Sequence, residues 1–196
     1  MNQKQVRVSE QALVPQILLA RGNRTIENVV SVFLGVMVLS VLAQIAIPLP
    51  WTPVPVTGQT FGVAFMSLLW GRRRGLAVVL SYIALGAFGL PVFALGKSGF
   101  MFGPTMGYLV GMVVASYWMG LLSDWGWTKT FFRSYLAAAS GSLITFCFGA
   151  LVLSTFVPSG TWFIAGVLPF IPGDIIKTLV ASYLAYQTQK KMTVTN

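Results

Sequence analysis

Long blocks of apolar residues dominate this chain, and charged clusters or segments rich in Gly and Pro separate them. A helix needs about 20 mainly apolar residues to cross the hydrocarbon core of a membrane, and most of the blocks approach that length. The pattern predicts six membrane crossings, near residues 29–47, 56–70, 75–90, 104–122, 134–157 and 162–187.

Composition agrees with a membrane protein. Of the 196 residues, 56% are hydrophobic and 9% are charged, which leaves too little polar surface to coat a water-soluble globule. We predict an all-α, polytopic membrane protein, with one six-helix domain over residues 29–187, an arm over 1–28 and a tail over 188–196. The arm is too long and polar for a signal-peptide n-region, so it is expected to be retained.

The basic residues gather on one side of the predicted crossings, and Lys97 alone lies on the other side. By the positive-inside rule, both termini, with the arm and the tail, are expected in the cytoplasm. The net charge of +9 comes from short clusters at block ends, as in lipid anchors, so no nucleic-acid partner is expected. The clustered residues are Lys4, Arg7, Arg21, Arg24, Arg72, Arg73, Arg74, Lys129, Arg133, Lys190 and Lys191.

Two segments on the predicted outer side are dense in Pro and Gly: the first loop (residues 48–58) and the second loop (residues 90–104). Neither can continue a helix. Irregular backbone at membrane depth must be buried in protein or line a cavity, so both are expected to be structured and to form a lid over the helix ends. Simple connectors are the alternative.

Asp174 and Lys177 are ionisable residues well inside an apolar block, where the remaining ones are tyrosines and Cys147. A charge in hydrocarbon costs at least about 2.5–3.5 kcal/mol, so such a pair persists only if it is paired, hydrated or bound to a ligand. Three residues apart, the two share a helix face and can neutralise each other. We predict a functional pair; a structural ion pair is the alternative. Cys147 is expected to be a buried thiol.

Pro172 is suited to the first turn of a helix. A helix over 172–187 would be about 24 Å long, shorter than a hydrocarbon core of about 30 Å. The sixth crossing is therefore predicted to be broken, with residues 162–168 completing it and Asp174 in the outer half of the membrane.

Pro104 opens the fourth block in the same way, and Gly103 and Gly107 let a ligand approach the backbone there. Thr105 and Tyr108 add hydroxyl groups. Discontinuous helices that direct their N-termini at one cavity are typical of transporter substrate sites. For Gly107, a close helix contact is the alternative.

Other polar residues lie near the same predicted cavity. Gln59 begins the second block, and Tyr82 lies within the third. Either side chain can reach the cavity or make a hydrogen bond between helices, and both interpretations stay open. An apolar lid is expected from aromatic residues of the two loops, namely Trp51, Phe93, Phe100 and Phe102.

Four motifs occur in order along the chain: Pro-Val-Pro-Val-Thr-Gly-Gln-Thr (53–60), Gly-Ala-Phe-Gly-Leu-Pro-Val-Phe (86–93), Gly-Pro-Thr-Met-Gly-Tyr-Leu (103–109) and Leu-Pro-Phe-Ile-Pro-Gly-Asp-Ile-Ile-Lys (168–177). Together they resemble the BioY family, the biotin-specific substrate-binding component of energy-coupling factor (ECF) transporters. The resemblance covers residues 30–187.

The resemblance implies a protein of the prokaryotic cytoplasmic membrane that captures biotin on the outer side. Its partners would be membrane lipid, a transmembrane coupling subunit and two ATPase subunits, with no cofactor. Asp174 and Lys177 would meet the biotin head group, and a lining is implied for Gly103, Pro104, Thr105, Gly107 and Tyr108. Ser31 and Gly35 form a small-xxx-small pair that would contact the coupling subunit.

Two alternatives remain within the transport class: a substrate-binding component for a different vitamin, and a solitary biotin transporter that works without the ATPases. An enzyme is not expected. Asp174 is the one carboxylate within the blocks, whereas an aspartyl protease needs two. The chain has no His and one Cys, too few ligands for a metal site or a Cys/His pair.

Overall fold

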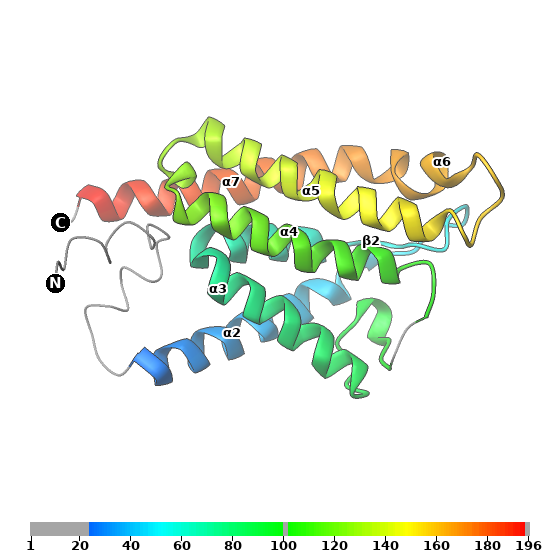
Figure 1. Ribbon diagram of the computed structural model, residues 1–196, viewed down its shortest axis with the longest axis horizontal. Coiled ribbons are helices and arrows are strands. Elements are labelled where there is room, and N and C mark those ends of the chain that lie inside the picture. The colour runs from blue at the N-terminus through cyan, green and yellow to red at the C-terminus, as the bar shows by residue number, and fades with distance from the viewer. Residues whose placement is uncertain (1–23, 100–101, 195–196) are drawn as a thin grey trace, which may run out of the picture.

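The computed structural model describes residues 24–99 and 102–194 as a bundle of helices (Figure 1). The mostly helical class is confirmed, with one addition, a short antiparallel strand pair in which Ala46 is opposite Thr57. The elements are α2 (Arg24–Gln44), β1 (Ala46–Ile47), β2 (Val56–Thr57), α3 (Gln59–Ala87), η2 (Ala94–Gly96), α4 (Met106–Asp124), η3 (Trp127–Lys129), α5 (Phe131–Leu153), α6 (Trp162–Gly166), η4 (Leu168–Phe170) and α7 (Ile171–Val194).

Helix α3 folds back on itself at Gly71, where the backbone leaves the helical conformation with a positive φ of 73° that favours glycine. In a straight helix Gln59 and Tyr82 would be about 35 Å apart, yet their side chains share a hydrogen bond of 2.6 Å. The two halves touch near the turn, because a Cβ on Gly75 would lie 3.0 Å from the Ser67 Cα. The predicted blocks 56–70 and 75–90 are therefore the two arms of a tight hairpin.

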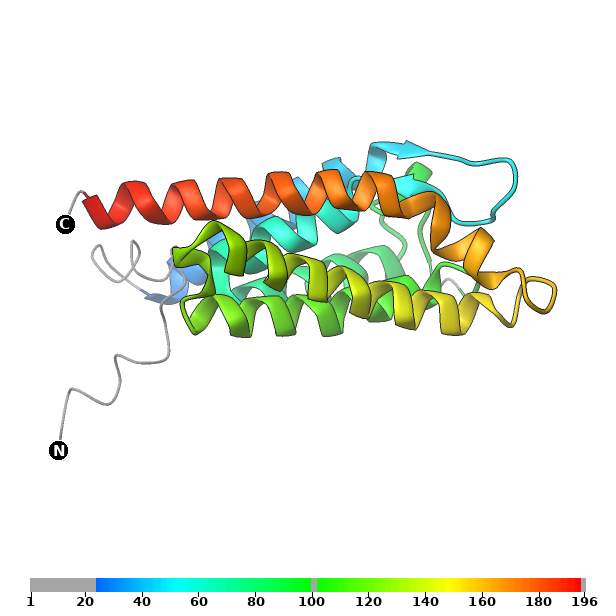
Figure 2. The ribbon, with the colours of Figure 1, turned by 90° about the horizontal axis from the view of Figure 1, so that it is seen from above.

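Helix α4 packs between α3 and α5, and small residues let α4 and α5 come close together (Figures 1 and 2). A Cβ on Gly107 would clash with the Phe148 carbonyl oxygen, and one on Gly111 would lie 2.9 Å from the Thr145 Cα. Gly149 in turn leaves room for the ring of Tyr108. Close approach through small residues is the usual way in which membrane helices gain packing energy.

Gly107→Ala is expected to lower the thermal stability of the detergent-solubilised protein, by about 1–3 kcal/mol, because the new methyl group overpacks the contact with α5. Gly103→Ala is the matched control, since a Cβ on Gly103 meets nothing within 4 Å. Thermal unfolding of the two variants measures the difference. Equal midpoints for both would show that α4 and α5 can separate without cost.

The predicted break in the sixth block is present at Val167, between α6 and η4, where φ is −126° and ψ is −58°. The predicted length of the following helix was wrong. Helix α7 is the long helix that leads to the C-terminus in Figure 2. It contains 24 residues and continues to Val194, so at 1.5 Å per residue it is about 36 Å long. The predicted domain boundary at residue 187 therefore lies inside a helix.

The described part of the second loop makes several contacts with the bundle. Gln44, at the end of α2, donates to the carbonyls of Val92 (3.3 Å) and Phe93 (3.1 Å), and its oxygen accepts the Gly96 N–H (3.0 Å). The Phe93 ring fills the space over Gly86 and meets the Tyr82 ring edge to face, with centroids 5.5 Å apart. These contacts hold the described part of the second loop against the bundle.

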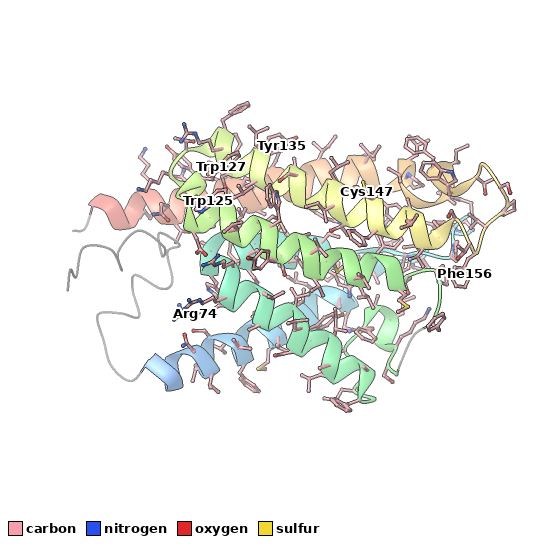
Figure 3. The ribbon with its side chains drawn as sticks, viewed as in Figure 1. Arg74, Trp125, Trp127, Tyr135, Cys147 and Phe156 are labelled. Carbon is pink, nitrogen blue, oxygen red and sulfur yellow. The ribbon has the colours of Figure 1, made fainter. Side chains whose placement is uncertain are left out.

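The two ends of the bundle differ. The strand pair, η2 and α6 gather at one end, the loop end, while the C-terminal end of α7 lies at the other (Figure 1). Arg74, Trp125 and Trp127 lie toward that second end, the basic end, and Phe156 lies at the loop end (Figure 3). At the basic end the Arg72 Nε is 3.5 Å from Asp124 Oδ2.

The outward surface of the bundle is largely apolar, with exposed fractions of 63% for Phe33 and 70% for Leu151. Cys147 is also exposed on α5, so the prediction of a buried thiol was wrong. Three stretches of the described chain are long and apolar enough to cross a membrane: Met106–Asp124, Phe131–Leu153 and Trp162–Lys191.

Candidate binding cavity

A cavity opens at the loop end, where the two loops meet helices α3, α4, α5 and α7. Its lining is mixed. The apolar part includes Val54, Phe93, Leu109, Met112, Phe146 and Phe170, and the polar part includes Thr57, Gln59, Thr60, Thr105, Tyr108, Lys97, Asp174 and Lys177. A mainly apolar cavity with a few convergent polar groups is the usual form of a small-molecule site.

The predicted charge pair lines this cavity, but its two members do not touch. No salt bridge within 4.0 Å joins Asp174 and Lys177, but their opposite charges attract each other, as expected for two residues that share a helix face. Instead, the Ser142 hydroxyl donates to Asp174 Oδ1 at 2.9 Å. Each charge therefore has its own hydrogen bonds in addition to the attraction of the other charge, and both side chains remain available to a ligand.

Asp174 has acceptor capacity left. Its second carboxylate oxygen, Oδ2, has no hydrogen-bond partner in the part of the chain that the structure describes. A half-buried carboxylate oxygen that faces a cavity can accept hydrogen bonds from N–H groups of a ligand, and such charge-assisted bonds are stronger than neutral ones.

Lys177 joins α7 to the first loop. Its ammonium donates to the Thr57 carbonyl at 2.7 Å and lies 3.5 Å from the Thr60 hydroxyl. Thr57 belongs to β2, 120 residues away in the chain, so the lysine fixes the position of the strand pair beside the cavity. An ammonium has three donors, which leaves one for a ligand acceptor.

Gln59 lines the cavity, while Tyr82 lies behind it and is absent from the lining. Gln59 donates to the Tyr82 hydroxyl at 2.6 Å, and that hydroxyl donates to the Val92 carbonyl at 3.0 Å. The Thr57 hydroxyl donates to the Gln59 oxygen at 3.0 Å. Tyr82 is 1% exposed. Of its two interpretations, the structure shows the hydrogen bond between helices and not a place in the cavity lining.

Of the residues predicted at the start of α4, Thr105 and Tyr108 line the cavity. Tyr108 also donates to the Gly166 carbonyl at 2.6 Å, which ties α4 to the end of α6. Gly103 and Pro104 are absent from the lining, and Gly107 is buried against α5. Gly107 therefore occupies the close helix contact that was its alternative interpretation.

The aromatic lid differs from the predicted one. Phe93 lines the cavity, but Trp51 and Phe102 are 62% and 82% exposed and do not. Phe100 lies outside the described residues. Phe146 of α5 and Phe170 of η4 line the cavity instead, with ring centroids 6.4 Å apart. Nothing in the sequence distinguishes these two from other phenylalanines of the apolar blocks.

The predicted contact residues for a coupling subunit lie on α2. Gly35 is buried against Trp70 and Val78 of α3, so it does not form an outward docking surface as predicted. Ser31 is half-buried. The exposed side of α2 carries large apolar residues instead, namely Val29, Val30, Phe33, Leu34, Met37, Val38 and Val41.

Apolar outward helices around a cavity lined by an acid and two lysines are the features of an integral membrane protein. The chain belongs to the BioY family, whose sequence model matches residues 11–194. It is 36% identical over 160 residues to the biotin transporter BioY of Thermotoga maritima, which covers 80% of this chain and 93% of that protein.

Two further comparisons agree. The chain is 39% identical over 161 residues to the probable biotin transporter BioY of Pyrococcus horikoshii, covering 81% of this chain and 93% of that protein. Its fold matches the crystal structure of the S-component for biotin from an ECF-type ABC transporter, with a TM-score of 0.79 at 25% identity. The match covers 87% of this chain and 94% of the other.

Proposed function

We propose that this chain captures biotin and takes part in its uptake as the substrate-binding component of an ECF-type transporter. The observation that carries the proposal is the cavity itself. It combines Asp174, Lys177 and Gln59 with the rings of Phe93 and Phe170 in a chain of the BioY family. The relatives bear the name biotin transporter, and the matching structure is a biotin S-component.

Biotin has groups that suit this lining. Its ureido ring offers two N–H donors and one carbonyl acceptor, next to an apolar thioether ring. In the proposed complex, Asp174 Oδ2 accepts from the ureido N–H groups, and the remaining Lys177 donor meets the ureido oxygen; the free capacity of both groups supports this. Phe93, Phe146 and Phe170 supply the apolar wall for the thioether ring.

The proposed arrangement in the membrane has six crossings, with both termini in the cytoplasm. The crossings are α2, the two arms of α3 on either side of Gly71, α4, α5, and the broken stretch from α6 to α7. Arg72, Lys129 and Lys190 lie at the basic end, which supports a cytoplasmic position for that end. The cavity then opens toward the outside of a prokaryotic cytoplasmic membrane.

The proposed partners are a transmembrane coupling subunit and two ATPase subunits. The sequence has no Gly-x-x-x-x-Gly-Lys-Ser/Thr loop with which to bind ATP itself. ATP-driven uptake would therefore depend on other chains. The exposed apolar side of α2 is the surface we assign to the coupling subunit, in place of Gly35.

Isothermal titration of biotin into the purified, detergent-solubilised chain tests the function. The expected dissociation constant is about 1 nM or lower, equivalent to about −12 kcal/mol or stronger. Biotin is also expected to raise the unfolding temperature, because it binds the folded state alone. Heat and thermal protection from another vitamin, with neither from biotin, would instead assign the chain to that vitamin.

A further inference from the structure

Three charged side chains line the cavity, and they differ in what surrounds them. Asp174 accepts from Ser142, and Lys177 donates to Thr57. The ammonium of Lys97 has no hydrogen-bond or ion-pair partner among residues 24–99 and 102–194. With one acid and two lysines, the lining carries an excess positive charge that the protein does not neutralise there.

The position of Lys97 is fixed although its side chain is exposed. Its backbone carbonyl accepts the Phe93 N–H at 3.1 Å, and the neighbouring Gly96 N–H is held by Gln44 at 3.0 Å. Phe93 is 4% exposed and anchors this turn in the core of the bundle. The second loop therefore presents the lysine at the solvent side of the cavity from a backbone that is held in place.

We infer that Lys97 binds the carboxylate at the end of the ligand's aliphatic tail and makes the site prefer an anionic ligand. The inference rests on the proposed function. A tail carboxylate near Asp174 would face a like charge on the same half-buried wall. At Lys97 it meets an unpaired cation in contact with solvent. The ureido ring then lies toward α7, and the tail points toward the second loop.

The preference has a measurable size. An ion pair at an exposed position contributes modestly, so loss of the ligand charge is expected to weaken binding about tenfold rather than a thousandfold. Because mobile ions screen such a contact, added salt should weaken binding of the anionic ligand and leave that of a neutral analogue unchanged.

The test compares biotin with biotinamide, the primary amide of its tail, by calorimetry on the full-length chain in a non-ionic detergent. The wild-type protein is expected to bind biotin about tenfold more tightly than biotinamide. In Lys97→Gln the two affinities should become equal, through loss of biotin affinity alone. Unchanged biotinamide binding then shows that the variant is folded.

Two further variants act as controls. Lys97→Arg keeps the charge and should keep the preference. Lys129→Gln removes an exposed lysine of η3, which is absent from the cavity lining, and should also keep it. If Lys97→Gln still binds biotin about tenfold more tightly than biotinamide, or if the wild-type protein binds both equally, the role of Lys97 is overturned while biotin binding stands. A wild-type protein that binds neither compound overturns the proposed function and this inference with it.

Discussion

Replacing Asp174 with asparagine is expected to weaken biotin binding by about 100-fold or more while leaving the protein folded. The asparagine oxygen can still accept the 2.9 Å bond from Ser142, so the contact between α5 and α7 survives. Its amide group, however, places donors where the ureido N–H groups need an acceptor. Calorimetry on the purified variant measures the loss, and thermal unfolding without ligand checks the fold.

Ser142→Ala is the matched control, because it removes the hydrogen bond to Asp174 and keeps the carboxylate. It should reduce affinity by about tenfold at most. Biotin binding to Asp174→Asn that equals binding to the parent would make Asp174 a structural residue and would move the head group elsewhere in the cavity.

Asp174 and Lys177 could be predicted as functional residues from the sequence, because a charge inside an apolar block is energetically costly. The same argument could not predict their partners. Ser142 lies 32 residues before Asp174, and Thr57 lies 120 residues before Lys177. Whether two residues on one helix face pair with each other or with other helices depends on how those helices are placed, and the apolar pattern does not encode this placement.

Glycines illustrate the same limit. Gly103 and Gly107 occupy similar positions around Pro104 in the sequence, yet one has open space beside it and the other touches α5. Gly35 was likewise predicted to contact another subunit, but in the structure it lies against Trp70 of the same chain. A small residue permits close approach, but the sequence does not say whether the approaching group is a ligand, another subunit or a helix of the same chain.

Helix ends were predicted to within a few residues where Pro or Gly marks them, as at Gly71 and at the start of α7. The C-terminal end of α7 was misplaced because polar residues such as Gln187 were taken as the end of the helix. A helix does not have to end where its apolar residues end, and α7 continues through polar residues to Val194. The strand pair of the first loop was missed because two-residue strands leave no periodic signal.

The chain alone, reconstituted in liposomes, is expected to bind biotin without concentrating it. Coupling to a proton gradient would require a carboxylate free to take up a proton and release it on the other side. Asp124 is paired with Arg72 at the basic end, and Asp174 is the cavity carboxylate that we assign to the ligand. Neither is therefore expected to carry a proton across the membrane. Addition of a coupling subunit and two ATPases of an ECF module should produce ATP-dependent accumulation of labelled biotin.

Two controls sharpen this experiment. The complete complex carrying Asp174→Asn should hydrolyse ATP but accumulate little biotin at concentrations near the wild-type dissociation constant, because the cavity is rarely filled. A protonophore should have no effect on the wild-type complex. Accumulation by the chain alone that a protonophore abolishes would contradict the dependence on partners, and it would identify a solitary transporter in which Asp174 carries the proton.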